Sequence, residues 1–357
     1  MSDALQTIAE QVRAARELRR PLRLRGGGSK DFYGGALQGH VLDLSGYSGI
    51  VEHEPSELVV TARCGTRIAE LQATLERAGQ CLAFEPPHFG PQATVGGMVA
   101  AGLSGPARAS AGAVRDHVLG VRVMNAAGEM LEFGGRVMKN VAGFDLARLH
   151  AGSMGILGPI LEVSLKVVPK PQATQTLFFE CTEAKGIEAL NRWAGIALPM
   201  SASLIHDQHL MVRLSGAEAA LESARTKLGG EVLDPEAAAT LWRAVREQTH
   251  PFFADDQRSL WRLSVPSTAP RLDLEGPQLI EWGGAQRWWR GEADFAVVCD
   301  KAAAVGGHAT LFRTRLRQPG APAFHPLSAV LQGLHERLKA SMDPDHLFNP
   351  GRLVPTL

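Results

Sequence analysis

The sequence of 357 residues predicts an α+β protein, and three observations support this fold class. Strand-like and helix-like segments alternate before residue 80, and glycine is concentrated between residues 84 and 158. The middle of the chain then runs strand, helix, two strands, helix, strand, which is the order of the split βαβ, or ferredoxin-like, unit. A chain of this length is expected to form two or three domains.

Segments of the first third are assigned in chain order. Apolar residues at helical spacing predict a helix over Ala4–Arg19, which Pro21 stops, and a second helix over Thr66–Ala78. Pro169 and Pro171 punctuate the chain, so we expect the first domain to cover residues 1–171. The expected strands are Leu22–Arg25, Val41–Leu44, Leu58–Ala62, Val121–Asn125, Glu129–Phe133 and Leu161–Val168.

The middle of the chain predicts a second domain at residues 172–320, with an antiparallel sheet. Its first unit combines strands at Thr176–Cys181, within Ala202–Ser215 and at Glu231–Leu233 with helices at Ala184–Ala197 and Ala217–Leu228. A second copy is expected between Leu260 and Arg313, with strands at Trp261–Val265, Leu279–Trp282, Arg287–Arg290 and Ala309–Arg313 and a helix at Asp294–Val305. Residues 321–357 are expected to form a helix, Leu327–Met342, and a tail that returns to the first domain.

Composition excludes several classes of function. The 37 basic and 37 acidic residues cancel, which argues against a general nucleic-acid binder. The four cysteines lie far apart and form no C-x-x-C pair, which argues against an iron–sulfur cluster or a structural zinc site. The start lacks a secretory apolar region, and no apolar stretch is long enough to span a bilayer. We therefore expect a cytoplasmic protein without a transmembrane segment.

Three glycine-rich segments could hold a phosphate group: residues 25–31, 91–102 and 143–158. Consecutive glycines let backbone N–H groups approach an anion closely. The first segment is not a Walker loop, because Ser29 precedes Lys30. The third lacks the G-x-G-x-x-G pattern of a nicotinamide site. A plain glycine-rich turn is the alternative for each segment taken alone.

Taken together, these segments carry a resemblance to a known family. Arg25–Ser29, Ala93–Gly97, Val114–Gly120 and Gly152–Gly158 resemble the FAD-binding domain of the vanillyl-alcohol oxidase (PCMH-type) flavoproteins, and Asp343–Gly351 is similar to that family's end. Lys139–Asp145 and the short length resemble the FAD-binding E subunits of bacterial glycolate oxidases.

The resemblance implies a two-subdomain PCMH-type FAD-binding domain, a ferredoxin-like cap, and FAD lying extended with its diphosphate on the first two glycine segments. Covalent members often have histidine in the first loop, where this chain has Ser29 and Lys30, so we expect non-covalent FAD. The implied cofactor-binding residues are Gly26, Gly27, Gly28, Ser29, Lys30, Thr94, Gly96, Gly97, Arg115, Asp116, Gly152, Gly155, Ile156 and Asn349.

Oxidation of a 2-hydroxy acid needs a cation for the carboxylate, a base for the hydroxyl proton and a hydride acceptor. We expect Arg313 and Arg287 as the cations and His308 as the base, because Gly306-Gly307-His308 leads into the strand that carries Arg313. The alternative is that these side chains solvate the sheet or make structural hydrogen bonds. No metal site is expected, because His206 and His209 have no further clustered ligand.

The resulting hypothesis is an FAD-binding subunit of a glycolate oxidase complex that oxidises a small 2-hydroxy acid. The resemblance implies a homologous FAD subunit, an iron–sulfur subunit that passes electrons to quinone, and a peripheral location at the inner membrane through these partners. One alternative is a non-catalytic electron-relay or assembly subunit beside a longer catalytic homologue. Another is a stand-alone flavin reductase of the same superfamily.

Overall fold

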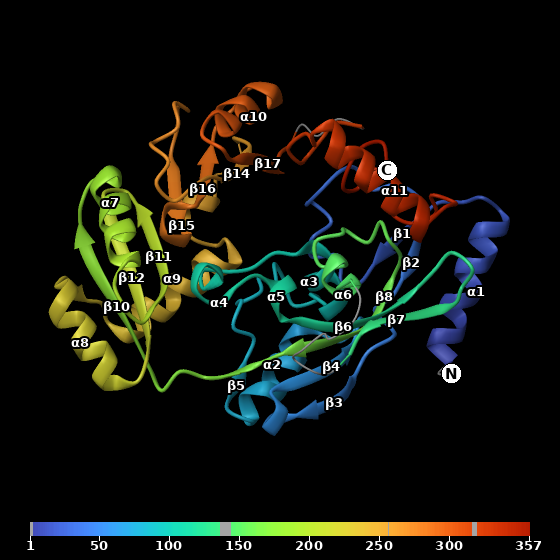
Figure 1. Cartoon of the computed structure of the whole chain (residues 1–357), viewed down its shortest axis with the longest axis horizontal. Helices are drawn as coiled ribbons and strands as arrows, with labels where there is room; N and C mark the ends of the chain where they lie inside the picture. The colour runs from blue at the N-terminus through green and yellow to red at the C-terminus, as the bar shows by residue number, and fades with distance from the viewer. Residues whose placement is uncertain (1–2, 136–143, 256, 316–319) are drawn as a thin grey trace.

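The computed structural model describes residues 3–135, 144–255, 257–315 and 320–357 (Figure 1). Its two large sheets, of five and eight strands, are antiparallel, and helices pack on both. The predicted α+β fold class is therefore confirmed. Part of the expected motif Lys139–Asp145 lies outside the described residues. None of the helices in these four ranges is long and apolar enough to cross a membrane.

The N-terminal unit, residues 3–169, is built on the five-stranded sheet of order β3-β4-β8-β6-β7. Valine and leucine side chains from one sheet face form a core with α2 and α3. The elements are β3 (Ile50–Glu54), β4 (Val59–Arg63), α2 (Ile68–Arg77), β5 (Gln80–Cys81), α3 (Val95–Ala101), α4 (Arg108–Ala111), α5 (Val114–His117), β6 (Val118–Met124), β7 (Met130–Gly134), α6 (Leu146–Leu149), β8 (Ile160–Lys166) and β9 (Val168–Pro169).

A smaller layer lies beside this sheet. It consists of α1 (Asp3–Glu17) and the parallel pair β1 (Leu22–Arg25) and β2 (His40–Asp43). Apolar residues of α1 recur at helical spacing and pack against this pair and against Phe348 of the C-terminal tail. The tail follows α11 (Ala329–Met342), and Phe348 forms a bridge to Leu22 of β1. Both ends of the chain therefore build the same layer (Figure 1).

The cap, residues 173–313, is a single eight-stranded sheet of order β13-β10-β12-β11-β15-β16-β14-β17. Each half has the ferredoxin-like strand order, and the halves join edge to edge where β11 pairs with β15. The second half lacks the first helix of that unit. The elements are β10 (Ala173–Glu180), α7 (Glu183–Ala194), β11 (Met200–His206), β12 (His209–Gly216), α8 (Glu218–Leu228), β13 (Glu231–Val232), α9 (Pro235–Glu247), β14 (Leu260–Ser264), β15 (Gln278–Glu281), β16 (Gln286–Arg290), α10 (Phe295–Ala304) and β17 (His308–Arg313).

The two faces of the cap sheet have different neighbours. Helices α7, α8 and α10 cover the outer face through apolar contacts. The inner face packs against α9 and against Tyr33, Leu103 and Met154 of the N-terminal unit. Side chains of a strand alternate between faces, so only every second cap residue can face the N-terminal unit. This alternation decides which of the predicted cap residues can reach a site at the junction.

Candidate cofactor site

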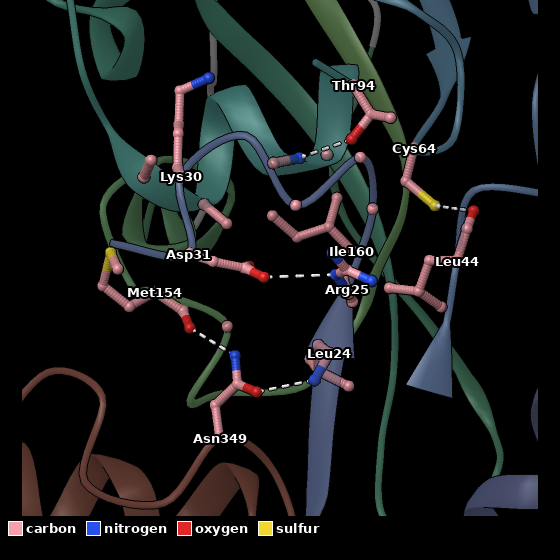
Figure 2. Close-up of a pocket in the computed structure, with 18 of the residues that line it drawn as sticks. Leu24, Arg25, Lys30, Asp31, Leu44, Cys64, Thr94, Met154, Ile160 and Asn349 are labelled. Atoms are coloured by element: carbon pink, nitrogen blue, oxygen red, sulfur yellow. Dashed lines mark hydrogen bonds and ion pairs between the residues drawn. The ribbon is translucent and has the colours of Figure 1, made fainter. Parts of the chain in front are cut away.

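A pocket lies where β1, the loop that follows it, α3 and the turn at residues 154–158 meet. Leu24 and Arg25 of β1, Asn349 of the C-terminal tail, and Thr94 and Ile160 are among the residues that line it (Figure 2). Ten of the predicted cofactor-binding residues line it: Gly26, Gly27, Gly28, Ser29, Lys30, Thr94, Gly96, Gly97, Gly155 and Asn349.

The first glycine loop presents its backbone to the pocket. The N–H groups of Gly27, Gly28, Ser29 and Lys30 donate to no acceptor within the described part of the chain. A Cβ on Gly27 would lie 1.5 Å from the carbonyl oxygen of Gln92, so only glycine permits this path. A concave run of free N–H groups is the arrangement that binds phosphate oxygens.

The second glycine segment contributes in another way. The side chain of Thr94 caps α3 by accepting a hydrogen bond from the N–H of Gly97, and the N–H of Gly96 donates to the carbonyl of Cys64. These N–H groups are therefore already used. A Cβ on Gly26 would lie 2.3 Å from Oγ1 of Thr94, which shows how closely the two segments approach. The second segment thus supports the first loop and forms a small-residue wall.

Charged residues behind the first loop were not predicted from the sequence. Arg25 lines the pocket and forms an ion pair of 3.3 Å with Asp31, which also pairs with Arg23. Two guanidinium groups thus face one carboxylate, which leaves positive charge beside the free N–H groups. Arg25 could have been predicted from the sequence, because it directly precedes the three glycines. Cys64 and Met154 also line the pocket, and burial raises the pKa of the Cys64 thiol to about 12.

Asn349 fixes the opposite wall. Its Oδ1 accepts a hydrogen bond of 2.7 Å from the N–H of Leu24, and its Nδ2 donates one of 2.7 Å to the carbonyl of Met154 (Figure 2). Gly155 has a φ of +75°, and a Cβ there would lie 2.7 Å from that Nδ2. The C-terminal tail therefore joins β1 to the turn at the pocket's edge.

Four predicted cofactor residues lie away from this pocket. Arg115 and Asp116 belong to α5, where Asp116 accepts a hydrogen bond from the N–H of Ala113. Gly152 donates its N–H to the carbonyl of Val99, behind the pocket wall. The side chain of Ile156 is buried beside Leu157 and Leu357. These four residues support the surrounding turns and do not line the pocket.

Lys30 and Arg313 come together at the junction with the cap. The side chain of Lys30 points away from the other labelled residues (Figure 2), and its Nζ lies 5.5 Å from the centroid of Phe89. The guanidinium carbon of Arg313 lies 5.2 Å from the same centroid and 4.4 Å from that of Phe32. Burial lowers the pKa of Lys30 to about 8 and that of Arg313 to about 10. Neither forms an ion pair with the described residues.

The other two predicted catalytic residues lie elsewhere in the cap. Arg287 points to the outer face, and its three nitrogens donate to the backbone carbonyls of Gly284, Pro270 and Ala269, so each nitrogen already has an acceptor. His308 is exposed at the start of β17, five residues before Arg313. That separation is roughly 16 Å along a strand, so the two side chains cannot contact one small acid.

The pocket fits a dinucleotide diphosphate by its own chemistry. It offers a row of unpaired N–H groups and positive charge from Arg25, on a loop whose backbone leaves no room for a Cβ at Gly27. Within the described residues no group of three potential metal ligands is found.

Comparisons with known proteins agree with this chemistry. The family model described as the FAD binding domain matches residues 3–134. The crystal structure of p-cresol methylhydroxylase superposes with a TM-score of 0.71 over 98% of this chain and 87% of that one, at 14% sequence identity, which shows a shared fold. The class of protein is therefore an FAD-binding flavoprotein with the PCMH-type fold.

Sequence relatives narrow the class. Glycolate oxidase subunit GlcE of Escherichia coli (strain K12) is 46% identical over 355 residues, 99% of each chain. Glycolate oxidase subunit GlcD of Bacillus subtilis (strain 168) is 34% identical over 45% of this chain and 34% of its own. The D-lactate dehydrogenase of Anaerostipes hadrus is 33% identical over 40% of this chain and 30% of its own. The chain belongs to the GlcE family of glycolate oxidase subunits.

Proposed function

We propose that this chain carries non-covalent FAD in the glycine-loop pocket and oxidises glycolate, or a similar 2-hydroxy acid, at the junction with the cap. The single observation that carries the proposal is the pocket itself, whose free N–H groups end at Lys30. Nζ of Lys30 and the guanidinium of Arg313 both lie near the ring of Phe89, and neither forms an ion pair with the described residues. FAD, when bound, accepts a hydride from the carbon that bears the hydroxyl group.

The protein's residues have separate roles in this proposal. The N–H groups of Gly27–Lys30 bind the diphosphate, with Arg25 balancing its charge. Asn349 and Thr94 hold the two walls in place. Arg313 and Lys30 place positive charge on the cap side of the pocket, where negative charge develops during oxidation. Arg287 takes a structural role, because its donors bind backbone carbonyls.

The finer assignment of partners follows from the family. We infer a homologous FAD subunit and an iron–sulfur subunit that accepts the electrons and passes them to quinone. Because the four cysteines lie apart, at positions 64, 81, 181 and 299, an iron–sulfur centre would have to come from a partner. The assembly would then meet the inner membrane through those partners.

Anaerobic spectroscopy tests the proposal. The purified chain, alone and reassembled with its partner subunits, is mixed with glycolate, and the flavin absorbance is followed. Bleaching in the chain alone supports oxidation by this chain. If glycolate bleaches the flavin only in the assembly and leaves the FAD spectrum of the isolated chain unchanged, the proposal is wrong. The relay role then explains the result.

The relay or assembly role is favoured by one observation. His206 and His209 face each other across the β11–β12 hairpin, and Nδ1 of His206 contacts the carbonyl oxygen of Gln278. They join no cluster of three metal ligands among the described residues. The test is to introduce Arg313→Met into the whole assembly. Unchanged glycolate oxidation would support this second role.

A further inference from the structure

A second, smaller pocket lies between the N-terminal unit and the cap. Pro87, Phe89 and residues 103–106 form one wall, and α9, β14, β15, β16 and Phe312 form the other. Two contacts link its wall to the wall of the cofactor pocket: the ring centroid of Phe89 lies 5.5 Å from Nζ of Lys30, and Leu103 packs in one apolar cluster with Ala101 and Met154. The last two residues line the cofactor pocket.

A buried carboxyl group faces the small pocket. Glu281, the last residue of β15, is 4% exposed. Its Oε2 accepts hydrogen bonds of 3.0 Å from Nε2 of Gln286 and 2.6 Å from Nε1 of Trp288. Both bonds end on the same oxygen. The other oxygen, Oε1, accepts none from the described residues and is available to a ligand.

The surroundings of Glu281 bring its pKa close to neutral pH. Burial raises the pKa of Glu281 to about 7, and the charge of Glu85 acts in the same direction. The two hydrogen-bond donors and the charge of Arg262 oppose this rise. Arg246 of α9 is the other charged group that lines the pocket, and Glu247 pairs with it at 2.8 Å. A carboxylate poised near neutral pH is suited to proton transfer.

An unneutralised cation lines the same pocket. Arg262 lies on β14, is half-buried, and forms no hydrogen bond or ion pair with the described residues. The buried Oε1 of Gln248, also in the pocket wall, has no hydrogen-bond partner among them. The pocket therefore offers a guanidinium and a free carboxyl oxygen. This set matches a carboxylate with a neighbouring hydroxyl donor.

We propose that Arg262 binds the carboxylate of the hydroxy acid and that Oε1 of Glu281 takes the proton of its hydroxyl group. The proposal rests on the function proposed above. The C2 hydrogen leaves with both bonding electrons to FAD, the hydroxyl proton passes to Glu281, and the C2–O bond becomes a carbonyl. Two electrons and one proton thus leave as hydride, one proton goes to the enzyme, and a 2-oxo acid is formed.

The first test measures proton linkage without turnover. Oxalate, a dianion that cannot donate hydride, is titrated calorimetrically into the FAD-loaded protein at pH 8 in two buffers of different ionisation enthalpy. We expect proton uptake on binding, because a second negative charge beside Glu281 raises its pKa. Glu281→Gln, which can still accept both hydrogen bonds, should abolish the uptake. Glu275→Gln, on an exposed loop residue, is the matched control and should retain it.

The second test measures the rate of flavin bleaching by glycolate against pH. In the wild type the rate should rise through pH 7. In Glu281→Gln it should fall about a hundredfold or more and lose this rise. Arg262→Lys should weaken oxalate and glycolate binding at least about tenfold, because a bidentate contact is lost.

The outcomes separate this inference from the proposed function. If glycolate never bleaches the wild-type protein or its assembly, the proposed function fails. If the wild type is bleached and Glu281→Gln behaves identically, or only His308→Gln loses the pH dependence, the inference fails alone. Should Glu281→Gln not fold, absence of proton uptake by the wild type, or unchanged binding by Arg262→Lys, would overturn the inference.

Discussion

Gly27 is the residue at which cofactor binding depends most directly on the absence of a side chain. Because a Cβ would lie 1.5 Å from the carbonyl oxygen of Gln92, Gly27→Ala must displace the first loop and its N–H groups. We expect FAD affinity to fall at least about tenfold, or about 1.4 kcal/mol. Fluorescence titration of the FAD-free protein measures this. Gly46→Ala is the matched control, because a Cβ there meets nothing within 4 Å. The FAD affinity of this variant should equal that of the wild type.

Lys30 gives a pH-dependent prediction. Its pKa is lowered by burial to about 8, against an ordinary value of 10.5. The unfolded chain therefore holds more protons than the folded one between these values, so Lys30 makes folding more favourable as pH rises through this window. Lys30→Met should stabilise the FAD-free protein by about 3 kcal/mol at pH 7 and by little above pH 10.5.

Denaturant unfolding of the FAD-free protein at pH 7 and pH 10.5 checks this prediction. Lys227→Met, at an exposed position of α8, serves as control and should show no such difference. A Lys30→Met variant that is less stable than the wild type at pH 7 would contradict the interpretation that burial dominates at this ammonium group.

Single residues also show what sequence patterns could not determine. The first glycine loop was predicted because three glycines in succession are typical of tight turns and of loops that bind anions. Arg287 and Arg313 were indistinguishable in the sequence, since both lie on expected strands. The register of the cap sheet directs Arg287 to the outer face, where backbone carbonyls bind it. A shift of one residue would reverse this, and no local pattern fixes such a register. Glu281 was missed for the same reason.

At the scale of elements, the C-terminal tail is the least replaceable part of the pocket wall. Lys339 of α11 and Asp343 form an ion pair of 2.6 Å, and both side chains are 0% exposed. Nζ of Lys339 also donates to the carbonyls of Ile156 and Phe348, and Asp343 accepts from the N–H of Leu347. One buried pair thus holds the helix, the tail and the turn at residues 154–158 together.

Lys339→Met should therefore destabilise the protein by about 3–5 kcal/mol, because it leaves a buried carboxylate without its partner. The double variant Lys339→Met with Asp343→Asn should lose less than the sum of the two single variants. Chemical denaturation of all four proteins gives the coupling free energy. Additive losses would show that the two side chains stabilise the tail independently.

Periodic elements were predicted well, and elements without a strong local pattern were not. The expected helix Ala4–Arg19 corresponds to α1 and the expected strand Leu161–Val168 to β8, because each has a clear apolar repeat. Strand β3 lies at the sheet edge, has no fully buried side chain and was missed. Helix α9 was also not assigned, although Ala238, Trp242 and Val245 recur at helical spacing and Asp234 caps it.

At the scale of the whole molecule, the edge-to-edge joining of the two cap halves could not be predicted from local patterns. The chain order indicated two ferredoxin-like units, one of them weak. Only the pairs Leu204↔Glu281 and Ile205↔Ile280 connect them into one sheet within the described residues. That joining places Glu281 on an inner strand, beside both halves and facing the N-terminal unit. The candidate catalytic pocket is therefore a product of the complete fold.

An aromatic cluster connects the cap to the N-terminal unit, and it carries the last prediction. Phe312 of β17 is 0% exposed, and its ring centroid lies 5.0 Å from Tyr33, 5.5 Å from Phe32 and 4.9 Å from Trp288. Phe312→Ala should destabilise the protein by about 3–5 kcal/mol through loss of buried contacts and the cavity left behind. Because the ring contacts both units, we expect one cooperative unfolding transition that shifts as a whole.

Urea unfolding followed by far-ultraviolet dichroism and by flavin fluorescence measures whether the two probes coincide. FAD at a hundred times its dissociation constant should add about 2.7 kcal/mol to the wild type. Phe144→Ala, at a side chain 95% exposed, is the matched control and should leave the transition in place. Separate transitions in the wild type, with Phe312→Ala moving only one, would mean that the cap folds independently. Substrate could then enter by displacement of the whole cap, since the junction would open without disturbing the cofactor pocket.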